Sequence, residues 1–163
     1  MITLPDKTRT STDIILEQIL NCTTKDNMLK VCKKFDLYVS QNLKKDETAR
    51  RISDELLDNP LEILSRLSKA ELQIIDEFEK GDDNTYVVRK MRKTPYILQK
   101  YYLTATFCDY VKDEWHILMP ARLRESLKDD YKFYLDLAED GKKGPSTKEL
   151  RMMAMMKKLY GRE

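Results

Sequence analysis

The stretch TFCDYVKDEWHILMP, residues 106–120, constrains the fold of this chain most, because it reads as a β-hairpin between segments that read as helix. Apolar and polar residues alternate imperfectly from Phe107 to Val111, and Trp115 to Met119 is a β-branched and aromatic run. Lys112-Asp113-Glu114 between them is short, polar and compatible with a turn. We therefore expect one hairpin at about 107–119.

Helical patterns flank this hairpin on both sides. Apolar residues recur at helical spacing, and capping signals at Asn59-Pro60, Ser68-Lys69-Ala70-Glu71 and Ser146-Thr147-Lys148-Glu149 mark helix starts. The expected helices cover residues 10–21, 23–37, 44–59, 61–67, 68–81, 95–105, 120–140 and 146–160. Residues 86–91 are expected to form a further short helix, although Val87-Val88 keeps a strand open.

The composition is that of a folded chain with its own core. Hydrophobic residues make up 41% of the 163 residues and charged residues 36%, so the surface is densely charged. The three cysteines form no CxxC pair and no complete disulfide framework, so we expect buried free thiols. No run approaches the roughly 20 apolar residues that a membrane span needs. We expect a cytoplasmic, mainly α protein, a helical bundle with one hairpin and no membrane contact.

Residues 27–57, NMLKVCKKFDLYVSQNLKKDETARRISDELL, follow the order helix, extended stretch, helix. Phe35-Asp36-Leu37 ends the first helix, and Asn42-Leu43-Lys44-Lys45 leads into the second, which closes with apolar residues from Ile52 to Leu57. This order resembles the helix-extended-helix module of SAP-type proteins and of the N-terminal part of the Rho terminator. Asp36 departs from that pattern, in which a glycine commonly precedes the leucine.

Residues 67–128 are similar to a winged helix in the order of their elements: helix, short helix, proline-started helix, two strands and a proline-led helix. The resemblance implies that the hairpin is the wing and that residues 95–104 are the recognition helix. It divides the chain into a helix-extended-helix-like module at 10–66, a winged-helix-like module at 67–140 and a C-terminal helix at 145–163. We expect these parts to form one compact unit.

The distribution of charge indicates a nucleic-acid partner, DNA or RNA. The net charge is only +2, but no acidic residue stands between Asp83 and Asp109. Lysine and arginine neutralise phosphates, and polar or aromatic side chains contact backbone or bases. The predicted binding residues are Arg89, Lys90, Arg92, Lys93, Tyr96, Gln99, Lys100 and Lys112. The alternative is a solvated basic loop whose tyrosines pack on the core, and the acidic residues beside Lys112 favour it at the wing tip.

The C-terminal helix supports a hypothesis of another class, a protein-interaction or assembly module without nucleic-acid contact. Its methionines form a soft apolar face that suits a partner groove or a homodimer; they are Met152, Met153, Met155 and Met156. Tyr131 and Tyr134 are expected to be exposed and to belong to the same docking surface. Burial statistics favour a simpler arrangement, in which this helix covers the protein's own core.

The sequence offers little for catalysis. The single histidine, His116, lies between Trp115 and Ile117 without an Asp, Cys or Ser at a known spacing, so we expect a structural role. Four isolated glycines form no phosphate-binding loop, and nothing supplies a second histidine or a cysteine cluster for zinc. We therefore expect no enzymatic activity, no cofactor and no metal site.

Overall fold

A four-stranded mixed sheet joins the N-terminal segment to the second half of the chain in the computed structural model, which describes residues 1–161. The strands, in the sheet order β1-β3-β4-β2, are β1 (Ile2–Leu4), β3 (Ala105–Asp109), β4 (Glu114–Leu118) and β2 (Val87–Lys90). β1 is parallel to β3, and the other two pairs are antiparallel. The predicted hairpin is confirmed as β3 and β4. Residues 86–91 hold a strand instead of a helix, because Val87 and Val88 suit a sheet.

Nine helices occupy about half of the chain within the described residues. They are α1 (Leu16–Asn21), α2 (Lys25–Lys34), α3 (Lys45–Asp58), α4 (Pro60–Leu64), α5 (Lys69–Lys80), α6 (Ile97–Lys100), α7 (Ala121–Leu127), α8 (Tyr131–Glu139) and α9 (Thr147–Leu159). The fold is therefore mixed α/β, which corrects the prediction of a helical bundle. The prediction missed β1, preferred a helix over the strand that Val87-Val88 left open, and so did not extend the hairpin into a sheet.

The helix predicted at residues 95–105 is a single turn, α6. Tyr102 has a φ of 63°, in the left-handed region, and this ends the turn. The Leu103 N–H then donates to the Leu98 carbonyl at 3.0 Å. Residues 101–104 connect α6 to β3 without helix, and Ala105, the last residue of the predicted helix, is the first residue of β3.

Two other helices differ from their predicted lengths. The first begins at Leu16, because the Thr10 N–H and hydroxyl donate to Asp13 Oδ2 in a preceding turn. The long helix predicted at 120–140 is divided into α7 and α8. The break lets α8 pack along α5, where the Tyr131 hydroxyl donates to Asp76 Oδ1 at 2.9 Å.

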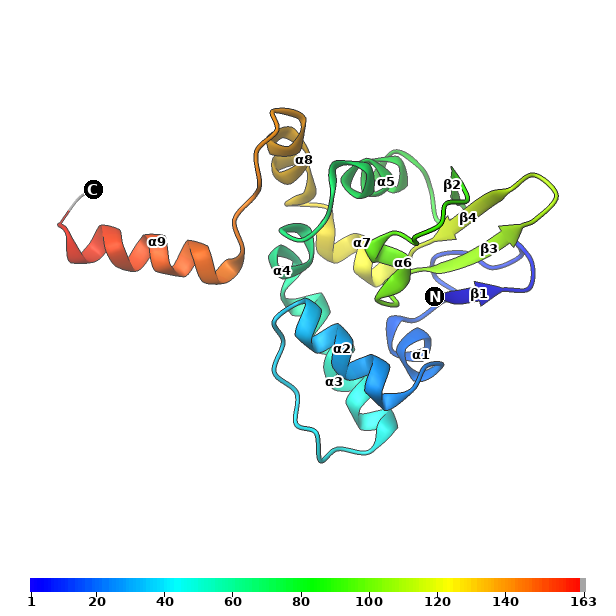
Figure 1. Cartoon of the computed structure of the whole chain (residues 1–163), viewed down its shortest axis with the longest axis horizontal. Helices are drawn as coiled ribbons and strands as arrows, with labels where there is room; N and C mark the ends of the chain where they lie inside the picture. Colours follow the sequence, from blue (N-terminus) through cyan, green and yellow to red (C-terminus); the bar gives the residue numbers. More distant parts are fainter. Residues whose placement is uncertain (162–163) are drawn as a thin grey trace.

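The main core lies between one face of the sheet and helices α1 to α8. Phe35, Ile75 and Phe78 are among its fully buried side chains, and Trp115 supplies part of the sheet's contribution. A smaller cluster on the opposite face of the sheet is covered by α1 and consists of Ile14, Ile19, Ala105 and Leu118. Figure 1 shows the sheet at one side of the molecule with α2 and α3 lying together below it.

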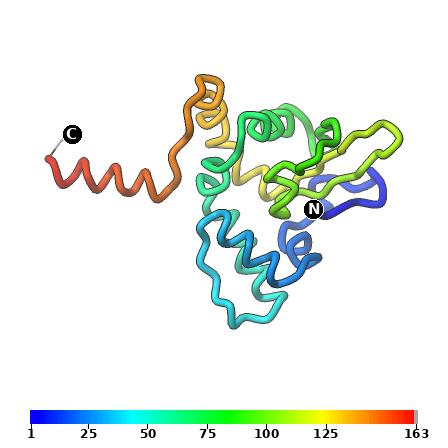
Figure 2. The backbone as a smooth tube through the Cα atoms, viewed as in Figure 1, coloured from blue at the N-terminus to red at the C-terminus, as the bar shows by residue number. Residues whose placement is uncertain are grey.

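Helix α9 projects away from this body (Figures 1 and 2). No residue of α9 is buried, and all of them after Thr147 are exposed, so the expectation that the helix covers the protein's own core is wrong. Its start is nevertheless attached, because the Thr147 N–H donates to Glu62 Oε1 at 2.9 Å. Tyr134 is also not exposed as predicted: it is buried, and its hydroxyl donates to the Pro145 carbonyl.

The three cysteines differ in their burial. Cys32 is buried, which raises the pKa of its thiol, and Cys108 is half-buried. Cys22 is exposed at the end of α1, contrary to the prediction of buried thiols.

Within residues 1–161, no helix combines the length and the apolar character that a bilayer crossing requires.

Candidate nucleic-acid interface

The basic residues predicted around β2 lie at the end of the sheet. Lys90 and Lys93 are exposed. Arg89 forms an ion pair with Glu77 of α5. The Arg92 guanidinium lies 3.8 Å from the centre of the Tyr96 ring, and its Nε donates to the Thr94 carbonyl at 2.9 Å. These contacts give the two arginines structural partners within the protein and leave the two lysines free to meet solvent.

Two of the predicted binding residues are inside the protein. Gln99 is fully buried, where its Oε1 accepts the Tyr96 N–H at 3.0 Å and its Nε2 donates to Thr106 Oγ1 at 3.1 Å. Tyr96 is 6% exposed and packs edge-on against Trp115. Both side chains fix α6 against the sheet and are not available to contact a nucleic acid.

Lys112 lies in the turn between β3 and β4, apart from α6. The turn is held by Asp109, whose Oδ1 accepts the N–H groups of Val111 and Lys112 at 3.1 Å each. The Met91 N–H donates to the Asp113 carbonyl at 2.9 Å, which brings the end of β2 against the same turn. Lysines and carboxylates are therefore mixed at this end of the sheet, with Lys90 opposite Glu114 in register.

The remaining predicted residue, Lys100, lines a groove of about 610 Å³ that the sequence did not indicate. We call it the lysine groove. Its lining consists of Met1, Asn27, Lys30, Lys33, Lys34, Lys100, Tyr101 and Tyr102. None of these lining residues is acidic. Within the described part of the chain, no carboxylate lies within 4.0 Å of any of the four lysine ammonium groups.

Helix α2 positions three of these lysines by its periodicity. Lys30, Lys33 and Lys34 stand at i, i+3 and i+4, so they share one face of the helix. The opposite face is buried through Met28, Val31 and Cys32. Like charges at these spacings repel one another by a few tenths of a kcal/mol per pair. An anionic ligand across the three side chains would relieve that repulsion.

Tyr101 connects α2 with α6 at the wall of the groove. Its ring lies 5.9 Å from the Phe35 ring in an edge-on contact, which fixes it against α2. The ammonium groups of Lys34 and Lys100 lie 5.5 and 5.7 Å from the centre of the same ring. The neighbouring Tyr102 also lines the groove. The groove thus combines four cationic side chains with two aromatic rings.

Comparisons with protein families, with curated proteins and with solved structures gave no match for this chain. The chemistry of the groove therefore carries the functional argument.

Proposed function

We propose that this protein binds single-stranded DNA or RNA through the lysine groove. The observation that supports the proposal is the set of four lysines and two tyrosines in one groove without an acidic lining residue. Cationic grooves that follow the backbone, with aromatic rings on which bases stack, are the usual construction of single-strand sites. In this proposal the lysines contact phosphates, while Tyr101 and Tyr102 contact bases.

Nucleic acid is the partner here as in the prediction from the sequence. The contact differs, because a single strand lies in the lysine groove, whereas the prediction placed a recognition helix on the nucleic acid. β2 stands where the winged-helix resemblance expects a short helix, so the order of elements departs from that resemblance, although the hairpin keeps the position of its wing. A recognition helix must extend into the major groove of a duplex, however, and α6 has only four residues. The groove beside α6 and on α2, the first helix of the helix-extended-helix-like segment, is therefore the preferred surface.

Fluorescence anisotropy tests this proposal. Labelled single-stranded DNA, single-stranded RNA and duplex DNA are titrated with the full chain over a series of salt concentrations. We expect the single strands to bind more tightly than the duplex and to bind less tightly as salt rises. Each lysine that contacts a phosphate should contribute about 0.7 to the slope of log K against log salt, or up to about 3 for all four.

Two variants locate the surface. The groove variant replaces four lysines by alanine: Lys30, Lys33, Lys34 and Lys100. The matched control removes the same charge from an exposed face of α3 and its N-terminal end, at Lys44, Lys45, Arg50 and Arg51. We expect the groove variant to lose binding and the salt slope, and the control to keep most of both. Equal losses in the two variants would contradict the proposal, because they would show a response to net charge alone.

A third variant separates the groove from the basic end of the sheet. Like the groove variant, it uses alanine, here in place of four residues predicted from the sequence: Lys90, Arg92, Lys93 and Lys112. Loss of binding in this variant, with binding kept in the groove variant, would move the site to the sheet end and support the original residues.

A second candidate function, self-association, is supported by helix α9. Six exposed apolar side chains of α9 and its C-terminal cap form a stripe on one side of the helix: Met152, Met153, Met155, Met156, Leu159 and Tyr160. Such a stripe at helical spacing suits a groove on a partner. A groove of about 310 Å³ between α1, α3 and α7 offers apolar walls that include Ile15, 46% exposed.

Charge complementarity favours a second copy of this chain as the partner. The groove between α1, α3 and α7 carries Glu17, Asp54 and Arg122 beside its apolar walls. Helix α9 carries Arg151, Lys157 and Lys158 beside its apolar stripe. We expect a concentration-dependent dimer in sedimentation velocity that Met152→Lys with Met156→Lys abolishes and Gln41→Lys with Gln73→Lys preserves. A parent protein that is monomeric at all concentrations would overturn this candidate.

A further inference from the structure

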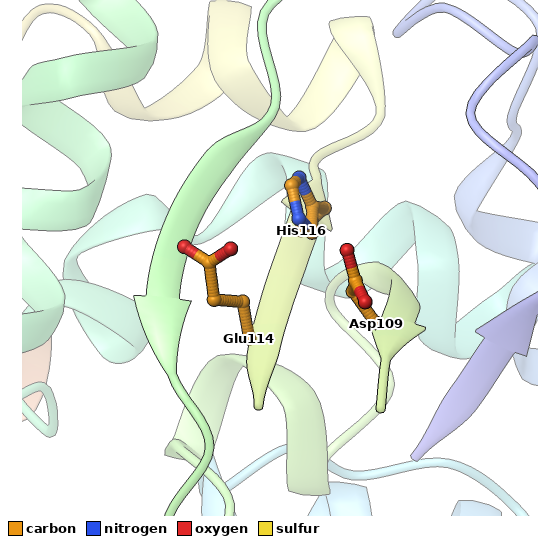
Figure 3. A group of neighbouring side chains, drawn as sticks. All are labelled: Asp109, Glu114 and His116. Carbon is orange, nitrogen blue, oxygen red and sulfur yellow. The ribbon is translucent and has the colours of Figure 1, made fainter. Parts of the chain in front are cut away.

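Three side chains able to bind a metal ion meet on one face of the β3–β4 hairpin. Asp109 and Glu114 are paired across the two strands, and His116 follows Glu114 by two residues on the same face. One imidazole nitrogen and one oxygen of each carboxylate lie within 4.8 Å of one another. Figure 3 shows the imidazole standing beside both carboxylates on this face.

His116 is also buried, with a ring nitrogen that is unpaired within the described residues. His116 is only 8% exposed, and within residues 1–161 its Nε2 is buried without a hydrogen-bond partner. A buried nitrogen of this kind normally has a partner, because leaving it unpaired destabilises the fold. An ion held by the two carboxylates would coordinate one of the imidazole nitrogens.

We propose that Asp109, Glu114 and His116 form a site for a divalent transition-metal ion of the Mn²⁺ to Zn²⁺ series. One nitrogen and two carboxylate oxygens are a donor set that these ions accept, whereas Mg²⁺ prefers oxygen alone. Bonds of about 2.1 Å place the donor atoms of a tetrahedral site about 3.4 Å apart. The three side chains would thus close by up to about 1.4 Å on binding.

The surroundings favour such a closure. The two backbone N–H groups on Asp109 Oδ1 orient that carboxylate, as outer hydrogen bonds do for metal ligands. Glu114 is half-buried near the end of the hairpin, where its longer side chain can adjust. Three protein ligands leave at least one coordination position for water or for an anionic ligand. The sequence did not predict this site, because the three residues are brought together by strand register and not by a spacing motif.

Isothermal titration calorimetry of the full chain with Zn²⁺, and separately with Mn²⁺ and Mg²⁺, tests the proposal. The titrations use Cys22→Ser as the parent, because the exposed Cys22 thiol would otherwise compete for zinc. We expect one Zn²⁺ per chain, weaker Mn²⁺ binding and no Mg²⁺ binding. Zinc should also raise the melting temperature of the parent and change the fluorescence of Trp115, the neighbour of both Glu114 and His116.

Three substitutions identify the ligands in this background: Asp109→Asn, Glu114→Gln and His116→Ala. We expect each to weaken Zn²⁺ binding at least tenfold, and Asp129→Asn, an exposed carboxylate on the loop before α8, to leave it unchanged. The two amide variants keep the shape of the side chains, so they decide the question even if His116→Ala fails to fold. The proposal is overturned if the parent binds no zinc at about 1 mM, or if both amide variants bind zinc as the parent does.

Discussion

Replacing Glu71 by alanine tests how the protein holds α6, the turn that carries Lys100 into the lysine groove. Glu71 is 2% exposed, and its Oε2 accepts the Leu98 N–H at 3.0 Å. Its Oε1 accepts the Ser68 hydroxyl at 3.1 Å. Because Leu98 is fully buried, the substitution leaves a buried N–H without a partner, which costs about 1–3 kcal/mol of the free energy of unfolding.

The cost should depend on pH, and its sign follows from the raised pKa of Glu71. Burial is the main cause that raises this pKa above the ordinary 4.5, against the hydrogen bonds from Leu98 and Ser68. The folded protein therefore binds this proton more tightly than the unfolded chain does. The resulting stability is present below about pH 4.5 and is lost as pH rises through the folded pKa. The difference between parent and Glu71→Ala should be larger at about pH 4 than at about pH 7.5.

Urea unfolding followed by Trp115 fluorescence measures this difference at both pH values. Gln73→Ala, at an exposed position of the same helix, is the control and should change the free energy of unfolding by less than about 0.5 kcal/mol. A difference that grows between about pH 4 and about pH 7.5 would refute the reasoning. It would mean that the ionised carboxylate is the form that stabilises the Leu98 contact.

Substitutions at three positions test the segment between α8 and α9, the lysine groove and α9. Gly144→Ala places a methyl group against the Tyr134 ring, so urea unfolding should show a loss of about 1–3 kcal/mol. Tyr101→Ala should weaken the binding of single-stranded DNA by about 1–3 kcal/mol in anisotropy if a base stacks on that ring, whereas Tyr101→Phe should keep most of the affinity. Ser146→Ala removes the capping box of α9 and about 0.5–2 kcal/mol of helix stability, which should lower the helix signal in circular dichroism.

The sequence predicted those elements that carry their own local signals. Ser68 caps α5 by accepting the Glu71 N–H at 3.3 Å, and Ser146 caps α9 in the same way. The hairpin followed from its two apolar runs and its polar turn. β1 could not be predicted, because three residues hold too little pattern and pair with residues about a hundred positions away.

In the candidate site, too, local sequence signals were predictive and contacts between distant segments were not. Lys100 was predicted from the lack of acidic residues around it, but its partners on α2 were missed. The prediction used only the apolar face of α2. The other face of that helix carries Lys30, Lys33 and Lys34 at helical spacing. The burial of Gln99 could not be foreseen, because Thr106, its hydrogen-bond partner, reaches it only when α6 lies against the sheet.

Asp36 stands where the predicted helix-extended-helix resemblance would place a glycine, and its backbone conformation is one that glycine adopts freely. Asp36 follows the C-terminal cap of α2 with a φ of 54°, in the left-handed region. The Leu37 N–H then donates to the Cys32 carbonyl at 2.8 Å, the closing hydrogen bond of a Schellman turn. Asparagine and aspartate tolerate this backbone better than alanine does, and glycine adopts it freely.

We therefore expect a specific order of stabilities at position 36. Asp36→Gly should stay within about 0.5 kcal/mol of the parent, because the relief of strain offsets the greater freedom of glycine in the unfolded chain. Asp36→Ala should lose about 1 kcal/mol. Asp36→Asn separates the backbone from the ion pair with Lys148, which spans 3.4 Å between two exposed side chains and contributes little. If the asparagine variant is as unstable in urea as the alanine variant, the carboxylate and not the left-handed backbone sets the stability of this turn.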